Sequence, residues 1–505
     1  MRPAPHDRVW PFVVCLLAFV LRVAGLNARP VWYDEAFAVL FAEKGFTAML
    51  AGTLTPVQGA AADVHPIVYY TSLNGWMSLV GQSPLAVRML SAFAGVTTVA
   101  AAYGIGRLLF DGRAATVGML VAAVSPFLVH YSQEARMYAP LALFCGLTIL
   151  FFWRAVRGMD LGKRGNFGNW VGVAVCTAAA MYMQNLAAVF LLAFGLSTLA
   201  RPKVFAKVAL AGSAAFVVWL PWFLNLRSQL AKLQQAYWVT QPTPLTLLQT
   251  AMVYHTGEEM LEAGVFLPLA LFAAIILPLM LVHQLFKLQQ EADGRRGGWL
   301  TALAFGTPVL LFVFSFYQPI YIQRALLPAG LMYATGLGWL LSPPVNTERM
   351  IPLPIRVVLS GLVVAVAATG LWVHYTFAQF PRPNFPAAIA YLRENIRPGD
   401  LILHSNKLTF FPMYYYDRTL PQSFLADPPG SGSDTLALPT QEVLGLYATP
   451  DVAAVGEANR VWLVIFERAI REYEPESHPH LVWLEENYRE VRTQKIDDLV
   501  IYRFE

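Results

Sequence analysis

Charged residues are scarce in this sequence. Of its 505 residues only 13% are Asp, Glu, Lys or Arg, whereas 56% are hydrophobic. Soluble globular proteins carry roughly 25% charged residues, because even a long soluble chain has to cover its surface with polar groups. Apolar runs of about 18 or more residues, the length of a transmembrane helix, recur through most of the chain. The composition therefore excludes a soluble protein and predicts a polytopic α-helical membrane protein.

Cysteine and the usual catalytic fingerprints are also lacking. The three cysteines, Cys15, Cys145 and Cys176, lie in apolar segments and form neither a disulfide framework nor a metal-ligand spacing. The sequence has no Walker or dinucleotide fingerprint and no HExxH, CxxC or GxSxG motif, which argues against nucleotide-dependent enzymes and the common zinc and serine hydrolases. The net charge of +4 is too small to indicate nucleic acid as a partner.

Eleven apolar segments are present, and we expect each to be a transmembrane helix. The first, residues 9–26, follows Arg2 and Arg8 like a signal peptide, but only a weak cleavage site lies near Ala28, so we expect it to stay as the first helix. The eleven segments are 9–26, 88–106, 114–130, 138–153, 169–183, 186–200, 208–223, 262–283, 299–317, 325–341 and 355–374.

Lysine and arginine are distributed unequally between the connections. The basic connections are 107–113, 154–168, 201–207, 284–298 and 342–354. Because short basic loops stay in the cytoplasm, this bias predicts a cytoplasmic amino terminus. Residues 27–87, 131–137, 224–261 and everything after about 375 then face outward. The large first outer loop, 27–87, has amphipathic stretches near 34–50 and 64–80, which can lie in the membrane interface.

The last 130 residues change character and indicate a soluble α/β domain. Asn384 is a plausible N-cap for a helix that ends at Pro398-Gly399. Residues 401–405, 461–466 and 499–504 are typical of short buried strands, 480–491 of an amphipathic helix, and 428–434 of a flexible loop. We therefore expect two domains, a membrane domain over 1–375 and an outer α/β domain over 376–505.

Polar side chains recur close to the outer membrane boundary, where charge is costly and ionisable groups are functional candidates. Each also has a purely structural explanation, such as an acid at a helix N-terminus, a turn, an ion pair, a lipid-headgroup contact or a helix-end anchor. The candidates are Asp34, Glu35, His65, Gln133, Glu134, Arg136 and Arg324.

Taken together, this set suits attack on a sugar that is attached to a phosphate. A phosphate leaving group requires positive charge rather than a proton, so the two carboxylates of glycosidases are not needed. One carboxylate of the Asp34–Glu35 pair would accept the proton of the acceptor hydroxyl as general base. Arg136, with His65 and Arg324, would stabilise the departing phosphate, because a guanidinium matches phosphate oxygens. Since adjacent helical residues point in different directions, the other acid of the pair would hold a cation or a backbone NH.

Four stretches resemble a known family. "VWYDEAFAVL", "HPIVYYTSLNGWMSLVGQSPLAVRMLSAFAGV", "GRLLFDGRAATVGMLVAAVSPFLVHYSQEARMYAP" and "QPIYIQRALLPA" are similar to bacterial glycosyltransferases of the GT-C class. The relatives are the family-39-like enzymes, akin to protein O-mannosyltransferases and lipid A aminoarabinose transferases. The resemblance is densest over 30–140, thins out to about 340, and extends to an appended outer domain. It implies a GT-C fold in the bacterial cytoplasmic (inner) membrane.

The resemblance also implies a polyprenyl-phosphate-linked sugar donor, an acceptor that is a lipid, glycan or protein, and an inverting direct displacement. It assigns Asp34 as the catalytic acid of the first outer loop. Glu35, Glu134, Arg136 and Tyr138 match motif positions expected around the donor phosphate and the acceptor, and Tyr70 and Gln133 lie in the matching stretches as further substrate-binding candidates.

The sequence departs from the family pattern in two places. His65-Pro66 is followed by Ile67, where relatives often carry a second proline, and Tyr182-Met183-Gln184 replaces a Tyr-x-His motif. Some relatives bind a divalent metal ion, for which His255, Glu258 and Glu259 in "YHTGEEM" are candidate ligands; the alternative is a solvated loop.

Two other functions fit a polytopic chain of this kind. A lipid-linked saccharide transporter or flippase would line a path through the bilayer with polar groups, although transporter sites usually lie near the midplane. A non-catalytic envelope scaffold would use the outer domain for binding and would tolerate replacement of Asp34.

Overall fold

The computed structural model describes residues 6–161, 166–235, 239–342, 351–427, 435–455 and 458–505. The chain groups into two compact units. The first contains Met1–Leu26, Arg88–Leu224 and Val239–Thr376, and the second contains Asn27–Val87, Asn225–Trp238 and Phe377–Glu505. The predicted loop at 428–434 lies outside the described residues.

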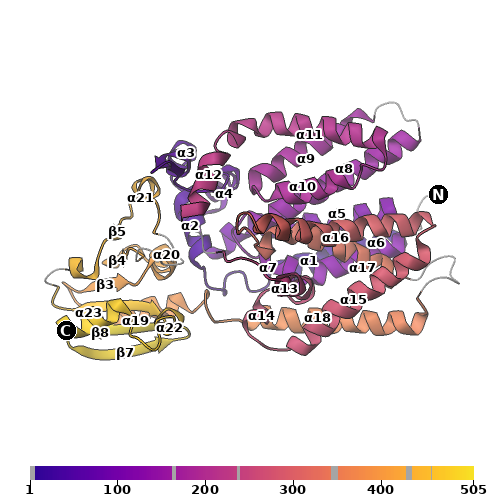
Figure 1. Ribbon diagram of the computed structural model, residues 1–505. Helices are drawn as coiled ribbons and strands as arrows, with labels where there is room; N and C mark the ends of the chain where they lie inside the picture. The colour runs from indigo at the N-terminus through magenta and orange to yellow at the C-terminus, as the bar shows by residue number, and fades with distance from the viewer. Residues whose placement is uncertain (1–5, 162–165, 236–238, 343–350, 428–434, 456–457) are drawn as a thin grey trace. The chain divides into compact units, whose positions relative to one another are not determined.

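The first unit is helical (Figure 1). Its helices are α1 (His6–Val23), α5 (Pro84–Leu109), α6 (Gly112–Val124), α7 (Pro126–Ser132), α8 (Tyr138–Asp160), α9 (Phe167–Met183), α10 (Ala187–Leu196), α11 (Pro202–Phe223), α13 (Pro244–Thr256), α14 (Glu259–Glu262), α15 (Leu267–Leu288), α16 (Ala292–Ser315), the 3₁₀ helix η1 (Gln323–Leu326), α17 (Leu327–Leu341) and α18 (Leu353–Thr376).

Each of the eleven predicted segments overlaps one or two helices, but the count of eleven spans is not confirmed. Among the described residues, α5, α8, α11, α15, α16 and α18 are long and apolar enough to cross a membrane, with a seventh span if the bent pair α6–α7 is one. Helices α9, α10 and α17 have only 17, 10 and 15 residues. At about 1.5 Å per residue a ten-residue helix is roughly half the thickness of a bilayer core.

The third predicted span is broken between α6 and α7, which meet at an angle of 58°. Pro126 lacks a backbone N–H, and the residue before a proline is driven out of the helical region. Ser125 accordingly is extended and caps α7 by accepting a hydrogen bond from the backbone N–H of Leu128. The break leaves carbonyl groups at the end of α6 that need partners.

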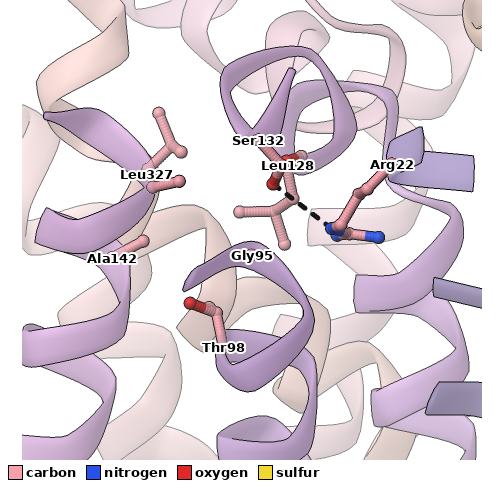
Figure 2. A pocket seen from close by; sticks show the side chains of 8 residues that line it. Arg22, Gly95, Thr98, Leu128, Ser132, Ala142 and Leu327 are labelled. Atoms are coloured by element: carbon pink, nitrogen blue, oxygen red, sulfur yellow. Dashed lines mark hydrogen bonds between the residues drawn. The ribbon is translucent and has the colours of Figure 1, made fainter. Parts of the chain in front are cut away.

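Arg22 of α1 supplies those partners. Its guanidinium donates to the carbonyl oxygens of Ala123 and Ala122, at 3.0 and 3.3 Å, and to Ser132 Oγ at 3.2 Å. A Cβ on Gly95 would lie 2.1 Å from Ser132 Oγ, so glycine is required for this close approach. The side chains around Arg22 leave no space for a water molecule between them (Figure 2). This region is therefore a packed junction and not a ligand pocket.

The second unit contains the first outer loop, which forms α2 (Tyr33–Ala42), α3 (Phe46–Leu54), the strands β1 (Pro56–Val57) and β2 (Ala60–Ala61), and α4 (Val68–Val80). The turn between β1 and β2 places Gln58 and Gly59 at φ 50° and 82°, as a tight hairpin turn requires. Helix α12 (Leu226–Gln235) packs against β2 in the same unit.

The rest of the second unit is the predicted α/β domain. Its elements are α19 (Phe385–Asn395), β3 (Leu401–His404), α20 (Lys407–Tyr416), β4 (Gln422–Leu425), α21 (Leu438–Leu444), β5 (Ala448–Thr449), the 3₁₀ helix η2 (Val452–Val455), β6 (Val461–Phe466), α22 (Glu467–Arg471), α23 (Pro479–Asn487), β7 (Glu490–Ile496) and β8 (Leu499–Phe504). The sheet order is β5-β4-β3-β6-β8-β7. Strands β3, β4, β5 and β6 are parallel to one another, and β8 pairs antiparallel with both β6 and β7.

Strand β6 is buried on both faces, which explains its uninterrupted apolar sequence. Trp462, Val464 and Phe466 pack with α19 on one face, and the alternate residues pack with α23 on the other. The predicted Asn384 cap is confirmed, since its side chain accepts from the Ala387 N–H at 3.1 Å. The helix predicted over 480–491 was too long: α23 ends at Asn487, and the residues after it form β7 against β8.

Candidate functional site

The segment between α7 and α8, residues 133–137, carries several predicted site residues. Gln133 lies at the C-cap of α7 and is fully buried. Its side-chain amide nitrogen donates to the carbonyl oxygens of Leu21 and Ala24 at 3.0 and 2.8 Å. These are carbonyls at the end of α1, where a helix has no partners of its own. Gln133 therefore has a structural role in joining α1 to α7.

Glu134 and His130 form a buried pair. His130 lies one helical turn before Glu134, and its Nε2 is 3.1 Å from Glu134 Oε1. Both residues are less than a tenth exposed. A buried carboxylate without a compensating partner is strongly disfavoured, so the histidine fixes where Glu134 is held.

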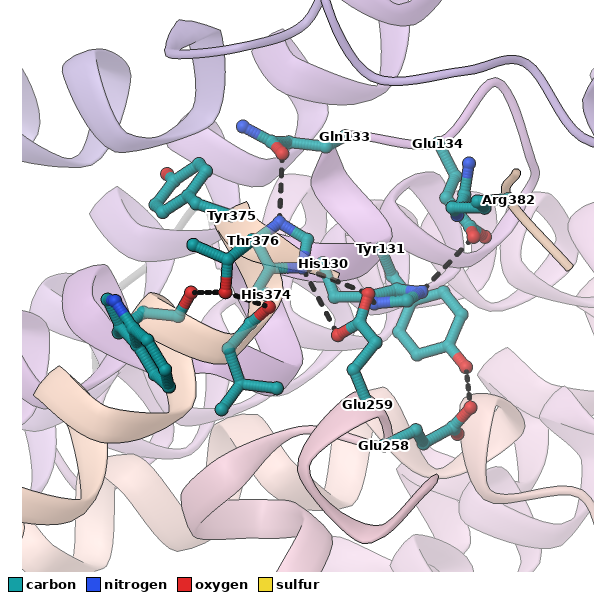
Figure 3. Close-up of polar contacts among 12 residues, drawn as sticks. His130, Tyr131, Gln133, Glu134, Glu258, Glu259, His374, Tyr375, Thr376 and Arg382 are labelled. Atoms are coloured by element: carbon teal, nitrogen blue, oxygen red, sulfur yellow. Dashed lines mark hydrogen bonds and ion pairs between the residues drawn. The ribbon is translucent and has the colours of Figure 1, made fainter. Parts of the chain in front are cut away.

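A second carboxylate, Glu259, reaches the same histidine. Glu259 Oε1 lies 2.6 Å from His130 Nδ1 and 3.1 Å from His374 Nδ1. His374 Nε2 in turn lies 2.9 Å from Gln133 Oε1 (Figure 3). One ligand atom from each of His130, Glu259 and His374 lies within 4.8 Å of the others, so this buried group can hold a metal ion. The three residues come from α7, α14 and α18.

Two further contacts bring predicted residues to this group. Tyr131 donates to Glu258 Oε2 at 2.6 Å, beside Glu259 in sequence. The guanidinium of Arg324, from η1, lies 5.2 Å from the ring centroid of Tyr138, whose ring also contacts Tyr131 at 5.3 Å. Burial raises the pKa of the Glu258 carboxyl above its ordinary value. The structure thus gathers Glu134, Tyr138, Glu258 and Arg324 around the carboxy-terminal end of α7 and the amino-terminal end of α8.

Arg136 is buried in the same segment, at 3% exposure. Its backbone carbonyl accepts a hydrogen bond from Ser91 Oγ of α5 at 3.1 Å. This bond fixes the backbone from which the Arg136 side chain extends. The Arg136 side chain is therefore buried rather than solvated, and a buried cation requires charged or polar partners.

In the second unit, Asp34 and Glu35 lie in the first turn of α2. Glu35 is fully buried and accepts from Arg382 Nη1 at 3.0 Å. Arg382 also donates to the carbonyl of Pro30 and stacks over Trp32 at 5.2 Å. Glu35 is therefore the member of the pair that holds a cation, whereas Asp34 is half-buried.

His65 and Tyr70 also belong to the second unit. His65 Nδ1 lies 2.9 Å from Asp63 Oδ1, within the turn that leads into α4. Tyr70 is 1% exposed, and its ring packs edge-on against Phe37 and Phe41 of α2. Tyr70 therefore contributes to the packing of α2 on α4.

Of the predicted metal ligands His255, Glu258 and Glu259, only Glu259 belongs to the His–Glu–His group that could hold a metal ion in the described part of the chain. His255 lies apart from the His–Glu–His group: it is buried, its Nε2 is 3.1 Å from Tyr333 Oη, and burial lowers its pKa to about 3. The solvated-loop alternative is also wrong, because His255 and Glu259 are each about 5% exposed. The sequence reasoning named Glu259 but missed His130 and His374. Both histidines lie in the last turn of a helix, and that position was the available signal.

The chain matches known membrane glycosyltransferases in sequence and in fold. Residues 64–226 match the family model described as dolichyl-phosphate-mannose-protein mannosyltransferase. This match and the fold confirm the predicted resemblance to the GT-C class of membrane glycosyltransferases. No curated protein matches the sequence.

Solved structures show the same fold over almost the whole chain. ArnT from Cupriavidus metallidurans in the apo state is 15% identical and aligns over 98% of both chains with a TM-score of 0.61. The same protein bound to undecaprenyl phosphate aligns with a TM-score of 0.56, at 15% identity and 98% coverage of both chains. The apo oligosaccharyltransferase of Archaeoglobus fulgidus is 11% identical, with a TM-score of 0.55 over 93% of this chain and 71% of that chain.

Proposed function

We propose that this protein is a polyprenyl-phosphate-dependent glycosyltransferase. It would move a sugar from a lipid-linked donor to a hydroxyl acceptor at the outer face of the membrane. The observation that carries the proposal is the alignment with ArnT over 98% of both chains. The family match at 64–226 supports it, because this stretch includes the buried Glu134 and Arg136, and so does the undecaprenyl phosphate bound to the relative.

The proposed reaction is an inverting direct displacement. The acceptor oxygen forms a bond to the anomeric carbon while the bond from that carbon to the phosphate oxygen breaks. The hydroxyl proton passes to the carboxylate of Asp34, and the polyprenyl phosphate leaves with the electron pair. Because phosphate is a good leaving group, the protein has to neutralise developing negative charge rather than supply a proton.

The residue roles follow from their chemistry. Asp34 is the proposed general base, and its half-buried position on α2 supports this assignment over Glu35, which is occupied by Arg382. Arg136 and Arg324 are proposed to bind the donor phosphate, a role that suits guanidinium groups.

The other predicted site residues take lesser roles in this proposal. His65 remains a candidate for the donor phosphate, and Glu134 for the acceptor. The packing of Tyr138 beneath Arg324 supports a role in orienting that guanidinium. Gln133 and Tyr70 are assigned to holding the scaffold, from their burial and contacts.

The proposed setting is the bacterial cytoplasmic membrane, with the amino terminus inside and the carboxy-terminal domain outside. The basic loops support this orientation. The acceptor would then be an envelope lipid, glycan or protein, with undecaprenyl phosphate as the carrier released.

The test first identifies the product in cells and then reconstitutes the reaction with purified protein. Mass spectrometry of envelope lipids, glycans and proteins from cells with and without the protein identifies the sugar-bearing product. The purified protein is then supplied with the matching undecaprenyl-phosphate sugar and acceptor. We expect a new glycosidic bond and stoichiometric release of undecaprenyl phosphate. Movement of the lipid-linked sugar across liposomes without a new bond would instead identify a transporter. If the protein showed neither activity, the scaffold function would remain.

A further inference from the structure

We propose that His130, Glu259 and His374 bind a divalent transition-metal ion of the zinc class. The ion would join α7, α14 and α18 next to the segment that carries Glu134 and Arg136. This inference is independent of the proposed sugar transfer, since it rests on the hydrogen-bond partners of the three side chains alone.

The tautomer of His374 is fixed by Gln133. The Gln133 amide nitrogen faces the backbone carbonyl oxygens at the end of α1, so its Oε1 is the atom 2.9 Å from His374 Nε2. An amide oxygen only accepts. His374 Nε2 therefore carries the hydrogen, and in the neutral ring Nδ1 presents a lone pair to Glu259, whose two oxygens lie 3.1 and 3.2 Å away.

The tautomer of His130 is fixed by Glu134. A carboxylate only accepts hydrogen bonds, so His130 Nε2, 3.1 Å from Glu134 Oε1, is the donor. Glu259 Oε1 also only accepts, and it lies 2.6 Å from His130 Nδ1, so either a second ring proton or a metal ion has to lie between these two atoms. Although Glu259 Oε1 is close to His130 Nδ1, the contact does not have hydrogen-bond geometry, and Nδ1 has no other hydrogen-bond partner among the described residues.

The His130 Nδ1, His374 Nδ1 and Glu259 carboxylate atoms meet at one buried place (Figure 3). If both rings are neutral, each of these atoms presents a lone pair there. Such an arrangement is repulsive unless a cation lies between the atoms. A divalent ion would also offset the charges of Glu134 and Glu259 while both rings stay neutral. The competing arrangement is two added protons, one on each ring, which gives the same net charge without a metal.

The hydrogen bonds at the second ring nitrogen of each histidine favour the metal over the two protons. Histidines that bind a metal usually donate their other ring N–H to a carboxylate or a carbonyl oxygen, which sets ring orientation and basicity. His130 does this to Glu134 and His374 does it to Gln133. Two imidazoles and a carboxylate are the ligands preferred by Zn²⁺, whereas Mg²⁺ and Ca²⁺ prefer oxygen ligands throughout.

The ion would have a positioning role. His130 holds Glu134, and Gln133 holds the end of α1, so a metal at this point would fix both ends of the 130–134 turn. The residues after this turn are those proposed to meet the donor. Loss of the ion should therefore loosen the turn even where the fold survives.

The decisive measurement is the metal content of the purified full chain in detergent by elemental mass spectrometry. We expect about one zinc-class ion per wild-type chain and almost none in His130→Ala or His374→Ala. His255→Gln is the matched control, because His255 is equally buried in the same unit but bonds to Tyr333. That variant should keep its metal, and metal loss there together with retention in His374→Ala would overturn the assignment.

A second measurement covers the case in which a ligand variant fails to fold. Chelator treatment of the wild-type protein should lower its Tm, and Zn²⁺ but not Mg²⁺ should restore it. Co²⁺ in place of the native ion should give visible d–d absorption. A wild-type protein without stoichiometric metal and with a Tm insensitive to chelator would refute the site and leave the doubly protonated arrangement. All these readouts are independent of sugar transfer, so failure here and failure of the proposed function are distinguishable.

Discussion

Glu35 and Arg382 form a buried ion pair with 3.0 Å between Oε2 and Nη1, at 0% and 2% side-chain exposure. The pair joins the start of α2 to the segment before α19, within the second unit. Removal of one partner of a buried pair leaves an uncompensated charge, at a cost of about 3–5 kcal/mol. The ion pair with Arg382 therefore gives Glu35 a structural role that the adjacent Asp34 does not share.

Arg382→Met should accordingly destabilise α2 strongly, and adding Glu35→Gln should recover part of the loss. Hydrogen exchange of the peptides covering α2 and 380–385 in the full chain measures both. The control is Arg418→Met, since Arg418 pairs with Glu43 at the same 3.0 Å but is 41% exposed, and exposed pairs contribute about 0–1 kcal/mol. Equal effects of the two arginine variants would contradict the importance of burial.

Asp34→Asn should abolish sugar transfer without affecting expression or membrane insertion. The amide has the shape of the carboxylate but cannot accept the acceptor's proton, and general-base catalysis contributes about 10²–10⁴-fold. The loss should appear in kcat measured with the purified protein, with KM for the donor little changed. Near wild-type turnover would show that another group is the base.

Arg136→Lys should also be impaired. A lysine supplies the charge but not the two parallel N–H groups that match phosphate oxygens. Loss of one charged hydrogen bond is worth about 1.5–3 kcal/mol, or roughly 10–100-fold in kcat/KM. Arg468→Lys, at a residue 63% exposed in the carboxy-terminal α/β domain, is the control for generic effects of the substitution. Full activity of Arg136→Lys would assign that guanidinium a structural role.

Gly95→Ala should destabilise the first unit, because its Cβ would meet Ser132 Oγ at 2.1 Å and Arg22 Nε at 2.9 Å. Overpacking of this kind costs about 1–3 kcal/mol. Gly306→Ala in α16 is the matched control, since nothing lies within 4 Å of its added Cβ and alanine has the higher helix propensity. Thermal unfolding in detergent should give Tm shifts of opposite sign, and a neutral Gly95→Ala would show that the junction around Arg22 can relax.

The carboxy-terminal α/β domain should lose stability in mild acid. Burial lowers the pKa of His404 to about 3, against about 6.5 in an unfolded chain. The unfolded state therefore binds a proton that the native state does not, and stability present above about pH 6.5 is lost as the pH falls. From neutral pH to pH 5 the loss from this group is about 2 kcal/mol.

His404→Gln should remove that part of the pH dependence, because an amide does not titrate. Hydrogen exchange of the 401–416 peptide in the full chain at the two pH values, corrected for the intrinsic exchange rate, is the measurement. An unchanged pH dependence in the variant would mean that other groups, such as the buried His478 whose pKa is lowered to about 4, account for the effect.

Local sequence determined the elements of this protein. Each predicted apolar segment is helical, the Asn384 cap forms, and the strands β6 and β8 have the predicted bounds. These features depend on neighbouring residues only: hydrophobic runs, a side chain that caps its own helix, and β-branched residues in sequence. The missed strand β7 is mostly exposed and polar, so only its pairing with β8 makes it a strand.

Tertiary structure decided the assembly of the site. His374 and Glu259 are 115 residues apart in sequence and meet at about 3 Å, and no local pattern encodes that meeting. The sequence could place charged residues near helix ends, because a charged group is costly in the lipid-facing middle of a helix. Which carboxylate faces which histidine, and which of two adjacent acids is taken by an arginine, depends on the packing of helices from distant parts of the chain.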